Sequence, residues 1–266
     1  MTGGWGFKTY AILFIAFIYG PVLMLPLFSV NDSNFATFPL AGFTLRHYAD
    51  LWTQRPILEA LGNSVRIAAG VSVLATVVAM PAAIAVTRFR FAGKAPALAF
   101  MMLPLVVPSI VMAVALLVIV LRFLGIPLSL WTVAAGHVVV CLPFCLSVLV
   151  SRLEGFDASL EEASRDLGCA PMQTFWRLTF PLALPGIISS LLLGFIISFD
   201  EFVIAFFLTG TENTLPVYLY SQLRFPNSLP GTLALGSLIL IASTLLVVLA
   251  EVIRRRGVTS DNPGDI

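Results

Sequence analysis

Six apolar stretches, each long enough to cross a lipid bilayer, follow one another along this sequence. A bilayer core takes about 20 apolar helical residues, and an open sheet would leave backbone polar groups unsatisfied inside it. With 59% hydrophobic and 11% charged residues, the composition lies outside the range of soluble globular proteins. The sequence therefore predicts an all-α, polytopic membrane protein with a single transmembrane domain over residues 1–266. Its six spans are expected near residues 10–30, 63–87, 97–121, 131–150, 183–208 and 231–253.

The basic residues predict how these helices are oriented. Most of the Lys and Arg fall in segments that share the side of the N-terminus, which the positive-inside rule makes the cytoplasmic side. The first apolar stretch is too long for the core of a signal peptide, so it is expected to remain as a span. Both termini are therefore predicted in the cytoplasm, with residues 254–266 as a disordered tail. The cytoplasmic basic residues are Lys8, Arg88, Arg90, Lys94, Arg152, Arg165, Arg177, Arg254, Arg255 and Arg256.

The longest charged segment, residues 151–182, separates the fourth and fifth apolar stretches on the predicted cytoplasmic side. Ser159 and Glu162 have the spacing of a capping box, which predicts a short helix that starts near Leu160. Gly168 predicts the end of that helix, because glycine readily adopts the left-handed conformation that terminates helices.

A second short helix is expected directly afterwards. Pro171 suits the first turn of a helix, and Pro181 would end it. Phe175 and Trp176 would lie on its apolar side. Two short helices across the membrane face, polar on one side, predict a docking surface; the alternative is an ordinary amphipathic loop between spans.

The spacing of this segment resembles the cytoplasmic coupling motif of ABC importer permeases. The motif reads Glu-Ala-Ala, three residues, Gly, nine residues, then Ile-x-Leu-Pro, and this sequence departs from it mildly at Ser164, Leu178 and Phe180. The resemblance implies a bacterial inner-membrane permease whose coupling helix contacts an ATPase. The residues that it assigns to ATPase coupling are Glu162, Ala163, Arg165, Asp166, Gly168 and Pro181.

Two adjacent carboxylates, Asp200 and Glu201, lie inside the fifth apolar stretch. A charge at such depth costs at least ~2.5 kcal/mol, so both are expected to face protein or water rather than lipid. In one interpretation they attract a cationic substrate. In the other they form an ion pair or a helix-terminus contact, for example with Arg66 or Arg122.

The surroundings of these carboxylates are similar to those of spermidine/putrescine-type permeases. The similar segments are Ser198–Ile204 with Thr209-Gly210 and Thr214-Leu215-Pro216, and Arg88–Lys94. A polycation would also gain from aromatic faces through cation–π contacts. The resemblance implies a substrate pathway that includes Ser198, Phe199, Asp200, Glu201, Phe202 and Tyr218.

The resemblance also implies partners. It predicts a homologous second permease chain forming a heterodimer, two ATPase subunits that bind ATP and Mg²⁺, and an extracytoplasmic solute-binding protein. This chain is expected to hold no cofactor, because it lacks a phosphate-binding loop for ATP. It is expected to be neither an enzyme nor a nucleic-acid-binding protein, because the sequence has no catalytic pattern and no basic run interleaved with aromatic residues. The alternatives are an importer of another small amine-bearing or organic solute, and a proton-coupled secondary transporter.

His137, Cys141 and Cys145 share one helical face, and soft ligands of this kind bind copper or zinc. No further ligand is indicated, and buried cysteine is commonly a small hydrophobic residue, so no metal site is predicted. Residues 44–61 alternate apolar and polar positions at roughly helical spacing. They predict an interfacial helix, either touching a soluble partner or lying on the membrane surface alone.

Overall fold

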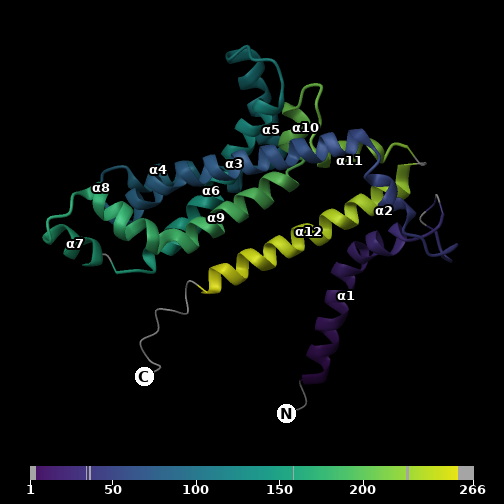
Figure 1. Cartoon of the computed structure of the whole chain (residues 1–266), viewed down its shortest axis with the longest axis horizontal. Coiled ribbons are helices and arrows are strands. Elements are labelled where there is room, and N and C mark those ends of the chain that lie inside the picture. Colours follow the sequence, from purple (N-terminus) through teal and green to yellow (C-terminus); the bar gives the residue numbers. More distant parts are fainter. Residues whose placement is uncertain (1–3, 34, 36, 158, 226–227, 257–266) are drawn as a thin grey trace. The chain divides into compact units, whose positions relative to one another are not determined.

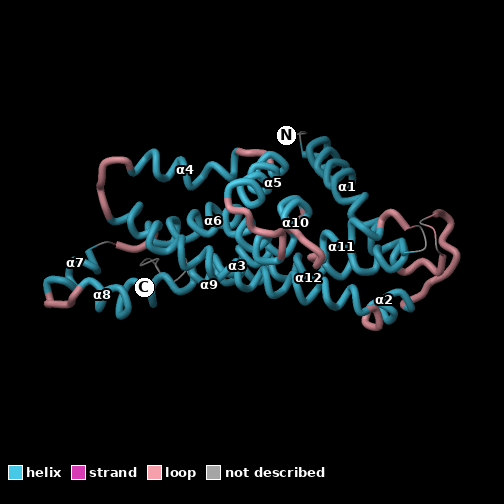
Figure 2. The backbone as a smooth tube through the Cα atoms, turned by 90° about the horizontal axis from the view of Figure 1, so that it is seen from above, coloured by secondary structure: helices cyan, strands magenta, loops and turns pink. Residues whose placement is uncertain are grey.

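The computed structural model describes residues 4–33, 35, 37–157, 159–225 and 228–256 and is built from helices joined by loops (Figures 1 and 2). Among these residues no strand is formed, although an antiparallel bridge pairs Asn31 with Phe43. Five helices within the described ranges are long and apolar enough to span a membrane, and counting one bent helix pair as a span gives six. The predicted all-α fold is confirmed.

The helices follow the six apolar stretches closely. Helix α12 includes Arg254–Arg256, so only residues 257–266 of the predicted tail lie outside the described residues. The π-helical turns η1 (Ile119–Phe123) and η2 (Phe175–Thr179) directly follow α5 and α8. The α-helices are α1 (Gly4–Ser29), α2 (Arg46–Leu51), α3 (Arg55–Arg88), α4 (Lys94–Val106), α5 (Ser109–Val118), α6 (Leu130–Glu154), α7 (Ser159–Asp166), α8 (Pro171–Thr174), α9 (Phe180–Asp200), α10 (Val203–Leu208), α11 (Leu215–Gln222) and α12 (Leu229–Arg256).

The chain divides into two compact units. One contains the described residues up to Glu59 together with those of 218–243, and the other contains residues 60–217 with the described residues from Thr244 onward. The larger unit holds the main hydrophobic core, in which Leu146, Leu149 and Leu153 of α6 are fully buried.

Helices α6 and α9 lie side by side in this larger unit (Figure 1). Small residues make the close approach possible, as is usual between membrane helices, where shape complementarity drives association. A Cβ atom added at Gly194 of α9 would lie 3.2 Å from Sγ of Cys145 and 3.3 Å from Cα of Ser72. Glycine at this position therefore lets α9 approach both α6 and α3.

The third apolar stretch is broken, unlike the continuous span predicted near residues 97–121. Helices α4 and α5 meet at 107° (Figure 1). Pro108 disfavours a helical conformation in the residue before it, and Val107 is accordingly extended, with φ −78° and ψ 128°. Pro108 thus forms the corner of this bent helix pair.

The fifth apolar stretch and the predicted interfacial helix are also interrupted. Helix α9 ends at Asp200, Glu201 is extended, and α10 begins only at Val203. The region 44–61 forms the short helix α2, a turn, and the start of α3 rather than one continuous helix. The spacing of the apolar residues predicts helices in these regions, but it does not reveal the positions at which the backbone interrupts them.

Candidate functional site

Helix α7 begins with a side-chain cap. The backbone N–H of Ser159 donates a hydrogen bond to Oδ1 of Asp157 at 2.9 Å. This bond stabilises the charged carboxylate, so it holds the pKa of Asp157 below its ordinary value. The helix therefore starts close to the predicted position, with Asp157 satisfying the N–H group that the proposed capping box had assigned to Glu162.

The end of α7 is a Schellman motif around Gly168. The N–H of Gly168 donates to the carbonyl of Arg165 at 2.8 Å, and the N–H of Cys169 donates to that of Ser164 at 3.2 Å. Gly168 has φ +84°, a conformation that glycine adopts without the steric cost of a Cβ atom. The predicted termination of the helix at Gly168 is confirmed.

The residues predicted to couple to an ATPase are exposed and lie on α7, in the turn that follows it, and at the start of α9, at the end of the larger unit where α7 and α8 stand (Figure 1). Large apolar side chains stand among them: Leu167 is 85% exposed, Met172 65% and Trp176 57%. A mixture of charged and large apolar side chains is typical of a surface that binds another protein. The exposed predicted residues are Glu162, Ala163, Arg165, Asp166, Gly168 and Pro181.

One residue of α7 that the sequence reasoning did not single out faces inward. Glu161 is buried and forms an ion pair with Arg88, at the end of α3, with Nε and Oε1 3.3 Å apart. Its neighbour Glu162 is exposed, because consecutive helical residues point in different directions. No local pattern distinguishes the buried Glu161 from the exposed Glu162, because two adjacent acids can share the polar face of an amphipathic helix.

The second short helix starts as predicted but does not end at Pro181. Pro171 occupies the first turn of α8, and η2 and α9 then continue without interruption, so that residues 171–200 form one long helical segment. Pro181 lies at the start of α9, directly after a π-helical turn. Pro181 therefore does not end the helical segment.

The predicted substrate-pathway carboxylates lie at the break between α9 and α10 rather than inside a continuous helix. Asp200, the last residue of α9, is exposed, and Glu201 is partly buried. Oε1 of Glu201 accepts a hydrogen bond from the N–H of Ile204 at 3.1 Å and thereby caps α10.

Three other predicted pathway residues pack around this break. The hydroxyl of Ser198 is buried and lies 2.9 Å from Nδ1 of His137. Phe199 stacks on Phe195 with ring centroids 5.8 Å apart, and Phe202 packs on Phe206 at 5.5 Å. Ser198 therefore joins α9 to α6, while the two aromatic rings contact rings of the same chain.

The face of α6 that carries two cysteines is a packing seam. The thiols of Cys141 and Cys145 point at the carbonyls of Gly194 and Ser190, at 3.6 and 3.7 Å. Thr76 of α3 lies 2.9 Å from the Ser190 hydroxyl. Within the part of the chain that the structure describes, no cluster of three metal-ligating side chains occurs.

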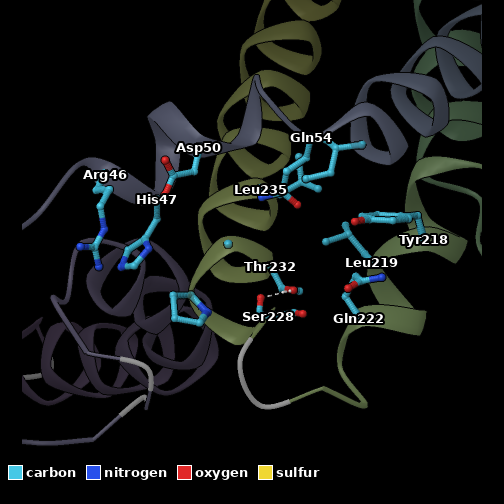
Figure 3. A pocket seen from close by; sticks show the side chains of 13 residues that line it. Arg46, His47, Asp50, Gln54, Tyr218, Leu219, Gln222, Ser228, Thr232 and Leu235 are labelled. Atoms are coloured by element: carbon cyan, nitrogen blue, oxygen red, sulfur yellow. Dashed lines mark hydrogen bonds between the residues drawn. The ribbon is translucent and has the colours of Figure 1, made fainter.

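Tyr218, the sixth predicted pathway residue, lines a polar pocket of about 380 Å³ inside the smaller unit. Arg46 and His47 stand on one side of this pocket, and Tyr218, Leu219 and Gln222 on the other (Figure 3). Partial burial raises the pKa of the Tyr218 phenol. Because Arg46 pairs with Asp32 at 3.5 Å, its charge is partly neutralised, while Asp50 adds a carboxylate to the lining.

Comparison with known proteins identifies the family. The sequence profile described as "Binding-protein-dependent transport system inner membrane component" matches residues 75–257. The chain belongs to this family. Its members are multi-pass inner-membrane transport subunits, so this chain is a transport permease rather than an enzyme.

Curated relatives of this permease come from polyamine transport systems. It is 33% identical to the spermidine/putrescine transport system permease protein PotC of Escherichia coli (strain K12), over 94% of both chains. It is 36% identical to the putrescine transport system permease protein PotI of the same strain, over 86% of this chain and 83% of PotI.

Solved structures support the fold of the permease. The alginate ABC transporter in complex with alginate pentasaccharide-bound periplasmic protein matches with a TM-score of 0.71 at 15% identity, over 95% of this chain and 93% of that chain. The MetNI methionine ABC transporter matches with a TM-score of 0.60 at 19% identity, over 77% of this chain and 99% of that chain.

Proposed function

We propose that this permease is a subunit of an ATP-driven importer for polyamines such as spermidine and putrescine. The observation that carries the substrate class is the 33% identity to a spermidine/putrescine permease over 94% of the chain. Asp200 and Glu201 at the helix break suit a substrate with several ammonium groups, because opposite charges attract one another. Another small amine-bearing or organic solute is the alternative.

The proposed assembly contains four further subunits. A homologous permease of different sequence completes the pathway, and two ATPase subunits bind ATP and Mg²⁺ on the cytoplasmic side, where both termini of this chain also lie. An extracytoplasmic solute-binding protein delivers the substrate, as the description of the family supports. The exposed charged and apolar residues of α7 and α8 support the ATPase contact.

In the proposed cycle, closure of the ATPases moves α7 and α8. Helix α8 continues through η2 into α9, so movement passes along one helical segment to Asp200. With 21 residues, α9 is about 31 Å long. Displacement of its end opens the pathway to one side of the membrane and then the other.

The substrate class is tested with the assembled transporter in proteoliposomes that contain ATP. Asp200→Asn and Glu201→Gln should each raise the KM for radiolabelled spermidine by about tenfold, because each removes an attractive charge. Glu212→Gln, an exposed acid in a loop, is the matched control. An unchanged KM in both carboxamide variants would contradict the cation site, and uptake driven by a proton gradient without any ATPase would favour the secondary transporter.

The coupling role is tested by a matched pair of glycines. Gly168→Trp and Gly93→Trp introduce the same strain, because the two glycines have φ +84° and +87° and no neighbouring atom within 4 Å of an added Cβ. Only Gly168 lies in the proposed docking surface. Gly168→Trp should therefore abolish ATP-driven uptake while the chain remains inserted, and Gly93→Trp should retain it; equal uptake by the two variants would argue against docking at α7.

A further inference from the structure

The inward face of α7 holds a charged contact that the docking surface does not use. Glu161 and Arg88 are nearly buried, with side-chain exposures of 10% and 11%, and their charged atoms lie 3.3 Å apart. A pair in such surroundings is screened little by water or salt. Its geometry is therefore more strictly maintained than that of an exposed ion pair.

Arg88 has two further partners, both near the end of α6. Its Nη2 donates to the carbonyl of Leu153 at 3.0 Å. Its guanidinium carbon stands 4.7 Å from the centre of the Phe156 ring, within cation–π range. Several contacts in different directions fix the planar guanidinium in one orientation.

Glu161 has a second partner in the segment that leads into α9. Oε1 of Glu161, the oxygen that contacts Arg88, also accepts a hydrogen bond from Oγ1 of Thr179 at 3.1 Å. Thr179 is buried and is the last residue of the π-helical turn η2. Through one carboxylate, α7 is attached to the ends of α3 and α6 and to the beginning of α9.

We propose that Glu161 and Arg88 are positioning residues that make α7 move as one body with the cytoplasmic ends of α3, α6 and α9. This inference rests on the proposed function of the chain as an ATP-driven permease. The exposed Glu162 and Arg165 would receive the force of the ATPase, and the buried Glu161 would pass it to three membrane helices together. Without the buried contact, α7 would retain its link through the turn at residues 167–170 and the contact of Ser164 with Thr174, 3.1 Å apart.

The test compares ATP hydrolysis with spermidine uptake in the assembled transporter in proteoliposomes. Glu161→Gln retains the shape of the side chain and an acceptor for Thr179 but removes the charge that holds Arg88. We expect uptake to fall about tenfold while ATP hydrolysis changes less than about twofold, so that more ATP is used per spermidine imported. Arg88→Lys, which keeps the charge, should restore most of the coupling relative to Arg88→Gln.

A second variant separates coupling from folding. Arg88→Met/Glu161→Leu replaces the buried pair with apolar side chains, a change that buried ion pairs often tolerate without loss of stability. It should assemble with the ATPase and still use excess ATP per spermidine. A normal ratio of ATP to spermidine in this variant, or in Glu161→Gln, would overturn the inference, whereas absence of ATP-dependent uptake by the unaltered transporter would overturn the proposed function itself.

Discussion

Two glutamates, Glu161 of α7 and Glu201 at the α9–α10 break, differ in how far along the chain their contacts reach. Glu161 is buried and contacts side chains of two other elements, Arg88 and Thr179. Glu201 is partly buried, and its carboxylate accepts a hydrogen bond from the N–H of Ile204 in the adjoining helix α10. The Glu161 carboxylate links segments that are distant in the sequence, whereas the Glu201 carboxylate contacts the helix that follows it.

From this difference we expect the surroundings of Glu161 to be more rigid than those of Glu201. A carboxylate held from two directions resists displacement, because moving it breaks several charge-assisted bonds at once. A local cap travels with its own helix and permits the adjoining break to bend. The comparison predicts graded effects of substitutions in the two regions.

The largest effect is expected when one partner of the buried ion pair is removed. Glu161→Ala leaves Arg88 as an uncompensated buried charge, which costs about 3–5 kcal/mol of stability. Glu162→Ala removes an exposed side chain and should change stability by less than about 0.5 kcal/mol. Thermal unfolding of the purified permease in detergent measures both, and equal shifts in the two variants would remove the distinction between them.

A smaller effect is expected from crowding the packing of α10 on α6. A Cβ atom at Gly136 would lie 2.6 Å from Cγ2 of Ile204 and 2.7 Å from Cδ1 of Leu208. Gly136→Ala should therefore destabilise the permease by about 1–3 kcal/mol. Gly70→Ala is the control, since no atom lies within 4 Å of its added Cβ. If Gly136→Ala were as stable as the control, the break would be more loosely packed than the structure implies.

Loss of the local cap should have a milder effect. Glu201→Ala removes the acceptor for the N–H of Ile204 and should cost about 1 kcal/mol. Glu201→Gln keeps a carbonyl oxygen and should retain most of that stability. Unfolding in detergent distinguishes the variants, and a loss as large as that of Glu161→Ala would show that Glu201 also has a long-range role.

The smallest effect concerns the pH dependence of the start of α7. The hydrogen bond from Ser159 lowers the pKa of Asp157 from its ordinary value of 3.8, so the folded state binds this proton less readily than the unfolded state. The stabilisation is present above the ordinary pKa and is lost as the pH falls through the lowered value. The protection of α7 amides, taken as exchange relative to the intrinsic rate of an unfolded peptide at the same pH, should therefore fall towards the acidic end between about pH 5 and pH 2. The fall should be smaller in Asp157→Asn, and protection independent of pH in the unaltered permease would contradict the cap.

Much of this architecture follows from local pattern, and the remainder depends on contacts between distant residues. Apolar length predicts the spans, and the left-handed preference of glycine predicts the turn at Gly168. The corner at Pro108 was missed because many prolines inside membrane helices are accommodated by neighbouring helices. The bond between Glu161 and Arg88 was missed because no local rule pairs residues that belong to helices so far apart in the chain.

The bonding of Glu161 has a consequence for biosynthesis. Arg88 is made long before Glu161, but Thr179 emerges from the ribosome after it, so the carboxylate cannot complete its contacts until the polypeptide has been extended into the next membrane helix. The final orientation of α7 is therefore reached only after the start of α9 has been synthesised.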